Sequence, residues 1–482
     1  MTRTALDAVR RGVPPGVAEL LDALLAEAER RDVAVHLVGG PVRDFLLGRA
    51  LRDLDLIVEP RDGQSVDADG LARGVALADA EVVSHDRFGT VRIARGGAAI
   101  DVATVRRERY VQPGALPTVE PGSLDDDLRR RDFTVNALAI PLTTAARRGR
   151  PAVIDPEDGR GDLAAGVLRV FHPQSFHDDP TRALRAARLA VRLGFRLSRG
   201  SRSALRDAVA AGAFGGVSGE RYRREIEKLF SDARLGLDPA AALRLLAEWH
   251  VLGALEPGLS LPPKARPALR RLGRAIAAPP IEDLRGEPWM AGLALWLADV
   301  DATSRRRTLR RLALRGDPAQ RLTDFPKRRD RMLRQLARAR GRGAVDAVLA
   351  DASDEELLAL LACAEPASRR RILRWANEDR RRRPPVTGND LVAAGLSGPA
   401  VGAALSRIRL GWLDGTVRTR DEAIVLAREV AMRVARRSRS AARKPKQKRA
   451  TRRASAALPE TPASPILPPT PPPNRTLLPE RQ

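Results

Sequence analysis

The spacing of apolar residues changes along the chain and predicts where strands and helices lie. Residues 15–32 carry leucine and valine at helical spacing, which predicts a helix. Residues 35–58, VHLVGGPVRDFLLGRALRDLDLIV, predict a strand, a glycine turn, a short helix and a second strand, because an apolar run meets two glycines and a proline suited to a first helical turn. Runs from residues 90 and 98, joined by two glycines, predict a β-hairpin. Beyond residue 163 helical spacing dominates.

Other stretches predict loops, breaks and a tail. Residues 105–128 follow neither the helical nor the strand period and are rich in proline and glycine, which predicts a long loop. Residues 176–195 predict one amphipathic helix. Prolines within 262–267 and 279–280 predict breaks between later helices. Residues 436–482 are first basic and then proline-rich, a composition typical of a disordered tail.

The first motif also carries candidate chemistry. The glycine turn, Gly39–Gly40, lets backbone approach a bound anion, and the helix after it directs its N–H groups to the same place. Arg43 adds a positive charge there. Asp53 and Asp55 alternate with leucines, so a strand would present both carboxylates on one face. Beside a phosphate cradle such a pair predicts a Mg²⁺ site, although an Asp-x-Asp pair alone also suits a solvated strand end.

Together these residues resemble the first motif of the class II tRNA nucleotidyltransferases and bacterial poly(A) polymerases, within the DNA polymerase beta superfamily. The resemblance implies an α+β fold, with a small mixed α/β nucleotidyltransferase head that is polymerase beta-like, followed by an all-α neck, body and tail. The expected parts are an N-terminal helix packing on the head (1–32), the head (33–145), a neck with the base-reading helix (146–232), a helical body (233–383), a tRNA-binding tail (384–435) and the disordered tail (436–482).

Further segments match other motifs of that family. Asp101 lies in the second strand of the predicted hairpin, where the resemblance implies a third carboxylate that completes the metal site. The run RRRDFTVNALAI contains Arg131, Asp132 and Asn136, which the resemblance assigns to holding the triphosphate and ribose. Arginine suits that task because its planar fork binds phosphate through two hydrogen bonds. Residues 155–163, DPEDGRGDL, resemble a third motif, a hinge-like turn after the sheet domain.

The segment DDPTRALRAAR resembles the motif that acts as a protein template for the incoming base. Asp179, Arg182 and Arg185 are three residues apart, so a helix would place them near one face. Arg188 continues the row. A carboxylate that accepts from an exocyclic amine, beside a guanidinium that donates to a ring nitrogen, would pair with C or A but not with U or G. The spacing alone favours an ordinary surface ion pair, and it is the resemblance that favours base reading. The family usually has Glu at Asp178, which bears on the preference between C and A.

Composition narrows the class of partner. The chain has 85 Lys and Arg against 60 Asp and Glu, a net charge of +25, which predicts a polyanion partner such as tRNA. Aromatic residues make up 3%, so phosphate contacts and shape are favoured over base stacking. The arginine-rich runs 301–345 and 369–383 suit either a solvated face or a track along an RNA backbone. The single cysteine, Cys363, excludes a disulfide within the chain and, without an apolar leader, favours a soluble cytoplasmic protein.

The sequence therefore predicts a template-independent enzyme that transfers nucleotides from CTP and ATP to the 3′ end of tRNA and completes CCA, with Asp53 and Asp55 holding Mg²⁺. An A-adding enzyme or a poly(A) polymerase of the same family remains an alternative, and a catalytically retired RNA-binding protein is a more distant one. In the resembled family the loop expected at 105–128 is needed for the last nucleotide, which argues against an enzyme that adds only cytidines. The oligomeric state stays open.

Overall fold

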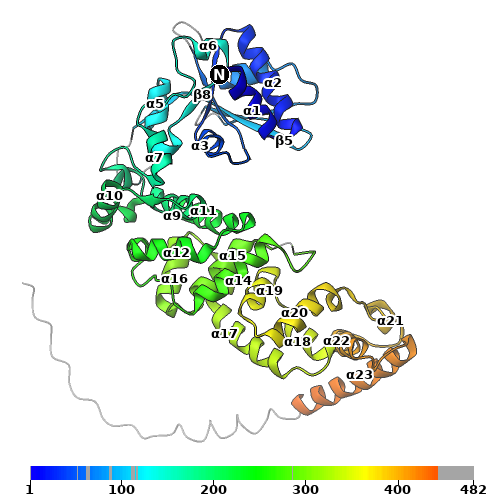
Figure 1. The fold of residues 1–482 in the computed structure, drawn as a ribbon. Coiled ribbons are helices and arrows are strands. Elements are labelled where there is room, and N and C mark those ends of the chain that lie inside the picture. The colour runs from blue at the N-terminus through cyan, green and yellow to red at the C-terminus, as the bar shows by residue number, and fades with distance from the viewer. Residues whose placement is uncertain are drawn as a thin grey trace, which may run out of the picture. The chain divides into compact units, whose positions relative to one another are not determined.

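The computed structural model describes residues 2–442, except 52, 61–65, 86–88, 110–113, 115–117 and 285. The chain forms two compact units, Met1–Arg381 and Arg382–Gln482, and each is described by itself (Figure 1). The first unit begins with two helices, forms a sheet and then continues in helices, whereas the described part of the second unit is helical. This order confirms the predicted α+β class.

A six-stranded mixed sheet forms the head, in the order β3-β4-β5-β2-β1-β8. Its strands are β1 (Ala34–Val38), β2 (Asp55–Glu59), β3 (Glu81–His85), β4 (Thr90–Arg95), β5 (Ala98–Thr104) and β8 (Ala139–Pro141). The β4–β5 pair is the predicted hairpin, and β1 and β2 are the two strands predicted within residues 35–58. Strands β2 and β5 run parallel, in a register that places Asp55 opposite Asp101. The sheet therefore brings two of the predicted carboxylates to neighbouring strands.

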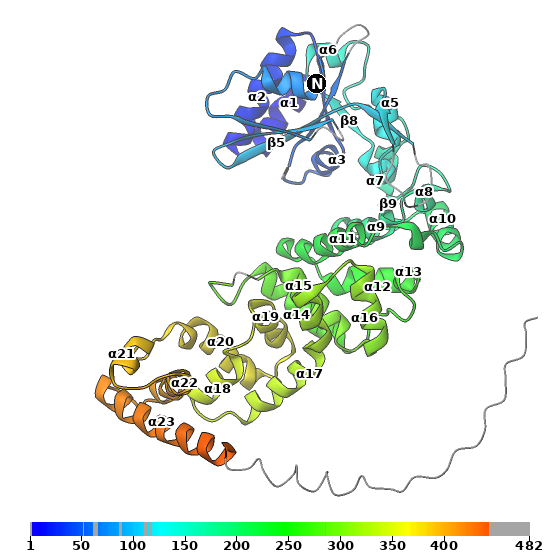
Figure 2. The ribbon, with the colours of Figure 1, turned by 180° about the vertical axis from the view of Figure 1, so that it is seen from behind.

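Both faces of the central strands are buried, which explains their nearly continuous apolar sequence. On one face α2 (Pro15–Arg30) and α4 (Ala68–Arg73) pack against the sheet, with Leu37 and Leu56 in that core (Figure 2). Ile57 points into a smaller core on the other face, which includes residues of α5 (Leu124–Arg129). The remaining helices of this region are α1 (Thr2–Gly12), α3 (Gly40–Leu46), η2 (Thr134–Asn136) and α6 (Thr144–Arg147).

Residues 105–128 do not form the continuous loop that the sequence predicted. Strands β6 (Arg106–Arg109) and β7 (Thr118–Pro121) pair as an antiparallel hairpin, and α5 follows. The strands are short and polar, with Arg107 Nη2 3.0 Å from Glu120 Oε2, so no apolar alternation marks them. A capping box between Ser123 and Asp126 starts α5, a local signal that apolar spacing does not register. The tip of the expected loop, 110–113 and 115–117, lies outside the described residues.

The predicted single helix over residues 176–195 is broken in two. Helix α8 (Ser175–Asp178) ends before Asp179, whose backbone is extended, with φ −137° and ψ 91°. Helix α9 (Thr181–Leu193) begins after Pro180. A residue before proline disfavours helical geometry, which accounts for the break. The other elements between the head and the body are α7 (Gly159–Ala165), β9 (Val167–Leu168), β10 (Arg196–Leu197), α10 (Arg199–Ala210), η3 (Ala213–Gly216) and α11 (Gly219–Ser231).

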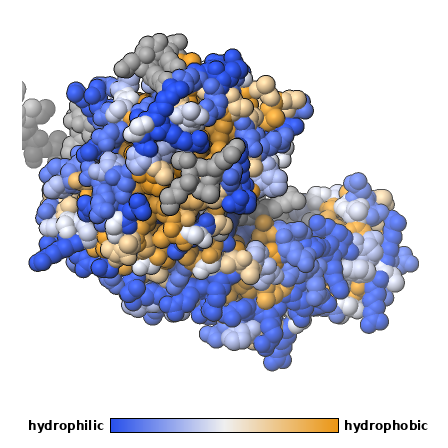
Figure 3. Space-filling model, turned by 45° about the horizontal axis from the view of Figure 1, so that its top comes forward, coloured by the Kyte–Doolittle hydropathy of each residue, from blue (hydrophilic) through white to orange (hydrophobic). Residues whose placement is uncertain are grey.

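The body is helical, as predicted. Its helices are η4 (Asp232–Leu235), α12 (Pro239–Glu248), α13 (Val251–Leu255), α14 (Ala265–Ala277), α15 (Pro288–Leu297), α16 (Ala302–Arg311), α17 (Gly316–Arg338), α18 (Arg342–Leu349), α19 (Asp354–Cys363), α20 (Pro366–Asn377) and η5 (Asp379–Arg381). Breaks fall between α13 and α14 and between α14 and α15, where prolines predicted them. On the face shown in Figure 3, hydrophilic residues form most of the outline and apolar residues show between them.

The second unit contains α21 (Gly388–Ala393), α22 (Pro399–Asp414) and α23 (Arg420–Ala442) around its own apolar core, which includes Leu391, Ile408 and Ala423. Helix α23 runs past residue 436, where the disordered tail was predicted to begin, and residues 443–482 lie outside the described part. Within the residues described, no helix combines the length and apolar character needed to cross a bilayer.

Candidate active site

The glycine turn after β1 is the point at which the site is assembled. Gly39 has φ +76° and ψ −136°, a backbone conformation open mainly to glycine. A Cβ atom at this position would lie 2.5 Å from Arg131 Nη1 and 3.6 Å from Asp55 Oδ2. The turn is therefore flanked by a guanidinium and a carboxylate, and the approach of a bound anion to its backbone stays a prediction.

The carboxylates lie at the start of β2. Asp53 and Asp55 are exposed while Leu54 and Leu56 are buried, so the predicted alternation is present. The pKa of Asp55 is raised, because surrounding protein atoms crowd its carboxylate although the residue opens onto a cavity. The negative charges of Asp101 and Asp53 raise it further, against the opposite effect of Arg131 and Arg43. Such concentrated negative charge favours a bound cation.

The donor set fits a hard divalent cation, since Asp53 and Asp55 offer carboxylate oxygens. Within the described residues, no three His, Cys, Asp or Glu side chains form a group that could hold a metal ion. Asp101 Oδ1 lies 3.3 Å from Arg92 Nη1 in an exposed ion pair, so its part in a metal site stays a prediction. Mg²⁺ commonly takes one or two protein carboxylates and completes its shell with water and substrate phosphates. The pair Asp53 and Asp55 agrees with this mode of Mg²⁺ coordination.

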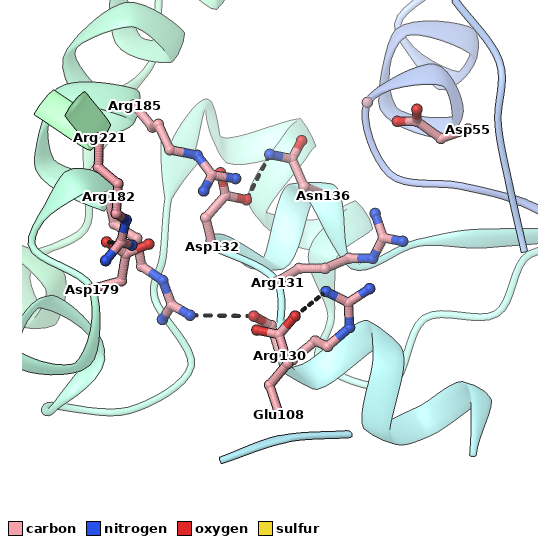
Figure 4. A pocket seen from close by; sticks show the side chains of 11 residues that line it. Asp55, Glu108, Arg130, Arg131, Asp132, Asn136, Asp179, Arg182, Arg185 and Arg221 are labelled. Carbon is pink, nitrogen blue, oxygen red and sulfur yellow. Dashed lines mark hydrogen bonds and ion pairs between the residues drawn. The ribbon is translucent and has the colours of Figure 1, made fainter. Parts of the chain in front are cut away.

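A cavity of about 430 Å³ opens beside Asp55, a size typical of small-ligand sites (Figure 4). In Figure 4 Asp55 lies on one side, Asp179, Arg182 and Arg221 on the other, and Arg131 and Asp132 between them. We call it the first cavity. Its lining residues are Gly40, Asp55, Glu108, Arg130, Arg131, Asp132, Asn136, Asp179, Arg182, Arg185 and Arg221.

Three of these lining residues were missed by the sequence reasoning. Arg130 lies within the run RRRDFTVNALAI, but it was given no role there. Glu108 lies on β6, in the segment that was predicted to be a loop. Arg221 lies on α11, and its contact with Asp179 spans 42 residues, so no local spacing signals it.

Arg131 has a donor to offer a ligand. Its Nη2 atom lies 3.0 Å from Asp127 Oδ2, and its Nη1 atom lies against the glycine turn. Its Nε atom is buried and has no hydrogen-bond partner within the described residues. A buried donor without a partner is costly, and Arg147 and Arg305 have an unpaired Nε atom of the same kind; Arg131 differs from them in lining the first cavity.

The side chains of Asp132 and Asn136 are held in place by contacts within the protein. Asp132 is 5% exposed, and although burial opposes its ionisation, Arg185, Asn136, Arg182 and the Phe133 N–H together hold its pKa below the usual range. Asn136 Nδ2 donates to Asp132 Oδ1 at 2.9 Å. Both side chains line the first cavity, yet each is already hydrogen-bonded.

Two predicted nucleotide-binding arginines do not line the first cavity. Arg43 is 3% exposed and donates to Asp44 and Asn136. Arg188 pairs with Glu225 and Asp232 on the side of α11. Both arginines line a second cavity of about 520 Å³, which also contains Asp53 and shares Gly40, Asp55 and Arg185 with the first.

The predicted base-reading pair has a different geometry from that expected. Asp179 does not share a helical face with Arg182, because it precedes α9. Its Oδ1 atom accepts from the Thr181 N–H, the Thr181 hydroxyl and Arg221 Nη2, at 3.0, 2.6 and 2.8 Å. Its Oδ2 atom accepts no hydrogen bond within the described residues. Arg182 is 5% exposed and donates to the carbonyls of Ser175 and Arg130 at 3.4 and 3.2 Å.

The mixed sheet, its carboxylates beside a glycine turn and the arginine-lined cavity define a nucleotidyltransferase head. Residues 35–169 match the family model described as the poly A polymerase head domain. The chain is 34% identical over 408 residues to the CC-adding tRNA nucleotidyltransferase of Deinococcus radiodurans, covering 83% of this chain and 91% of that protein. The chain therefore belongs to the tRNA nucleotidyltransferase family, as its motifs predicted.

Other relatives carry different names. The chain is 30% identical over 443 residues to the A-adding tRNA nucleotidyltransferase of Geobacter sulfurreducens, which covers 89% of this chain but only 49% of that protein. A CCA-adding enzyme of Thermotoga maritima, solved with tRNA, has a TM-score of 0.64 at 28% identity, covering 89% of this chain and 98% of that one. CCA-adding enzymes solved with ATP and with CTP have TM-scores of 0.66 and 0.65, at 27% and 28% identity, and each covers 87% of this chain and 96% of its own.

Proposed function

We propose that this chain adds nucleotides from CTP and ATP to the 3′ end of tRNA and completes the sequence CCA. The observation that carries the proposal is the first cavity, which joins the Asp55 carboxylate, the glycine turn and Arg131 to Asp179 and Arg182. Reacting, phosphate-holding and base-reading groups thus surround one space of small-ligand size. The similarity to enzymes solved with tRNA, ATP and CTP supports the choice of substrates.

In the proposed reaction the 3′-hydroxyl oxygen of tRNA attacks the α-phosphorus of the nucleoside triphosphate. The bond from the 3′-oxygen to the α-phosphorus forms, the bond from that phosphorus to the bridging oxygen breaks, and pyrophosphate leaves. Asp53 and Asp55 would hold Mg²⁺, which supplies neutralisation of phosphate charge and activation of the hydroxyl when bound. Arg131 offers its buried Nε donor to the triphosphate, and Asp132 and Asn136 hold the neighbouring cavity wall in place.

Asp179 and Arg182 are proposed to choose the base. The Oδ2 atom of Asp179 would accept from the exocyclic amine of C or A, while the Arg182 guanidinium donates to the adjacent ring nitrogen. U and G present a carbonyl and a ring N–H instead, so each unmatched buried group would cost about 1–3 kcal/mol. Arg221 holds the other oxygen of Asp179, which fixes the carboxylate for this contact.

The number of nucleotides added is the finer part of the proposal. Similar proteins are named for addition of A, of CC and of CCA. We favour full CCA addition because one cavity offers groups that suit both C and A, and because the resemblance associates the segment 105–128 with addition of the final A. A-only addition, CC-only addition and poly(A) synthesis are separate outcomes of one experiment.

The test uses tRNA transcripts that end before CCA, after C and after CC. Each is incubated with the purified chain, Mg²⁺ and one nucleoside triphosphate at a time, and then with CTP and ATP together. Full CCA addition requires C on the first two transcripts, A on the third, and a stop after CCA when both nucleotides are present. Extension of the CC-ending transcript alone would show an A-adding enzyme, failure to add A would show a CC-adding one, and a long homopolymer would show poly(A) synthesis. No extension of any transcript would refute the proposed activity.

A further inference from the structure

Two arginines of α9 hold the head at separate points. Arg185 Nη2 lies 2.9 Å from Asp132 Oδ2, and Arg192 Nη2 lies 2.9 Å from Asp44 Oδ2. The two arginines are about two helical turns apart, or roughly 10 Å along the axis at a rise of about 1.5 Å per residue. Asp132 follows α5 and Asp44 lies on α3, so α9 is attached to two different segments of the head.

The two carboxylates are joined to each other through hydrogen-bonded side chains. Asp44 Oδ1 accepts from Arg43 Nε and Nη2 at 2.9 and 2.8 Å. Arg43 Nη1 donates to Asn136 Oδ1 at 2.6 Å, and Asn136 Nδ2 donates to Asp132 Oδ1 at 2.9 Å. A closed ring of contacts therefore begins and ends on α9. We call it the α9 ring; its members are Arg185, Asp132, Asn136, Arg43, Asp44 and Arg192.

Each member of the α9 ring is oriented by its neighbours. Asp44 and Asp132 use both carboxylate oxygens, and Asn136 uses both ends of its amide. Asp44 and Asp132 are 7% and 5% exposed, so water screens these contacts less than it screens surface pairs. Loss of one contact therefore changes the orientation of the side chains on either side of it.

The α9 ring connects the two ends of the proposed nucleotide site. A Cβ atom at Gly40 would lie 3.5 Å from Arg43 Nη2, so the ring passes directly behind the glycine turn. Its other side is α9, which begins at Thr181 and carries the base-reading Arg182. The distance between the triphosphate position and the base-reading position is thereby set by where the ring holds α9.

We propose that Asp44 and Arg192 are positioning residues that determine nucleotide selectivity without contacting the nucleotide. Neither residue lines the first cavity, in which the nucleotide is proposed to bind, whereas both line the second cavity. Without Arg192, the C-terminal end of α9 loses its side-chain bond to the head, while Arg185 and Arg182 still bond to Asp132 and to the Arg130 carbonyl, and the helix tilts about these two contacts. Arg182 then stands at the wrong distance from the reacting phosphorus, so a correct base gains less from its pairing than before. This inference rests on the proposed function.

The test compares Arg192→Ala and Arg192→Lys with Arg196→Ala. Arg196 is a matched control, since it is an exposed arginine just after α9 whose guanidinium donates to the Ala165 carbonyl and not to the head. For each variant, kcat and KM are measured with CTP and with UTP on the transcript that ends before CCA. We expect Arg192→Ala to lower the ratio of kcat/KM for CTP over UTP by roughly tenfold, mainly through kcat, because small misplacements of reacting groups cost large factors.

The lysine variant keeps a positive charge near Asp44 and should recover part of the ratio, whereas Arg196→Ala should keep the wild-type ratio. If Arg192→Ala keeps the wild-type ratio of kcat/KM for CTP over UTP, the inference is overturned. A purely structural role would give this result, because the rates would then fall equally for all nucleotides. If Arg192→Ala turns over too slowly for steady-state kinetics, the ratio of single-turnover rates with CTP and with UTP, measured with the folded variant in excess over tRNA, decides in the same way. A wild-type protein that adds no nucleotide would instead refute the proposed function, so the two failures are distinguishable.

Discussion

Replacing Gly39 with alanine tests whether the glycine turn places Arg131. The backbone at Gly39, with φ +76° and ψ −136°, is strained for alanine and costs about 1–3 kcal/mol. The new Cβ atom would also lie 2.5 Å from Arg131 Nη1, so the guanidinium must move away from Asp55. We therefore expect Gly39→Ala to lose stability and to lose at least roughly a hundredfold in kcat/KM, the scale of a displacement of about 1 Å.

Gly236→Ala is the matched control for the stability that is lost when alanine adopts a positive φ. Gly236 has φ +78° and ψ 10°, and a Cβ atom there would meet nothing within 4 Å. Alanine in this left-handed conformation costs about 1–2 kcal/mol without displacing a neighbour. Denaturant unfolding should show a loss of stability in both variants, while nucleotide addition should fall only in Gly39→Ala. Wild-type kcat/KM in Gly39→Ala would refute the placement of Arg131 by the turn.

Three further variants probe single contacts. Asp53→Ala should abolish nucleotide addition and leave tRNA affinity in a filter-binding assay unchanged, because it removes a proposed cation ligand and no proposed RNA contact; retained addition would exclude Asp53 from the metal site. Arg221→Ala frees Asp179, the carboxylate proposed to read the base, and should raise misincorporation of UTP by about tenfold, on the scale of one lost charged hydrogen bond; unchanged misincorporation would show that Arg221 is dispensable there. Burial opposes ionisation of Glu59, yet His36 and Arg150 lower its pKa from 4.5 to about 2. The ionised Glu59 therefore contributes fully to stability above about pH 4.5, and this contribution is lost as pH falls toward 2. Urea unfolding across that range should show this loss in the wild type and not in Glu59→Gln, and an equal pH dependence in both would contradict it.

Features that depend on neighbouring residues were predictable from the sequence. The alternation of Asp53 and Asp55 with buried leucines follows from the two-residue period of a strand, and the β4–β5 hairpin follows from its glycines. The break before Pro180 also has a local cause, the restriction that proline places on the residue before it, but the apolar spacing of α9 outweighed that signal. The β6–β7 hairpin escaped detection because its strands are polar, and polar strands show no apolar period.

Contacts between distant segments could not be predicted in the same way. Asp179 depends on Arg221, which lies 42 residues away, and Asp44 depends on Arg192, which lies 148 residues away. Spacing along a helix indicates which side chains share a face, but it does not indicate which partner faces them from another element. Most predicted site residues line the first or the second cavity, whereas Gly39 and Asp101 line neither, and the roles of all of them stay predictions. Several of their individual partners differ from those expected.

The arginines account for much of this difference. Charge excess predicted a polyanion partner, and the arginine runs suited either a solvated face or an RNA track. The structure adds a third use, because several arginines bind carbonyls inside the protein. Arg305 is 8% exposed and donates from Nη1 to the carbonyls of Leu297 and Val300 after α15, and Arg371 donates to a carbonyl at the end of α17. The carbonyls at the end of a helix lack partners within it, and a guanidinium offers several donors to meet them.

Arginine donors in the candidate active site are likewise mostly bonded to acceptors within the protein. Arg43 and Arg188 have the residue type and position expected of phosphate ligands, yet they donate to carboxylates and, for Arg43, also to the Asn136 amide oxygen. Arg131 differs from them by one buried Nε atom without a partner in the described residues. In a chain with so many arginines, the residue type alone does not identify a ligand-binding group. An unpaired buried donor does not identify one by itself either, because Arg147 and Arg305 also have a buried Nε atom without a partner in the described residues. Arg131 differs from these two in lining the first cavity.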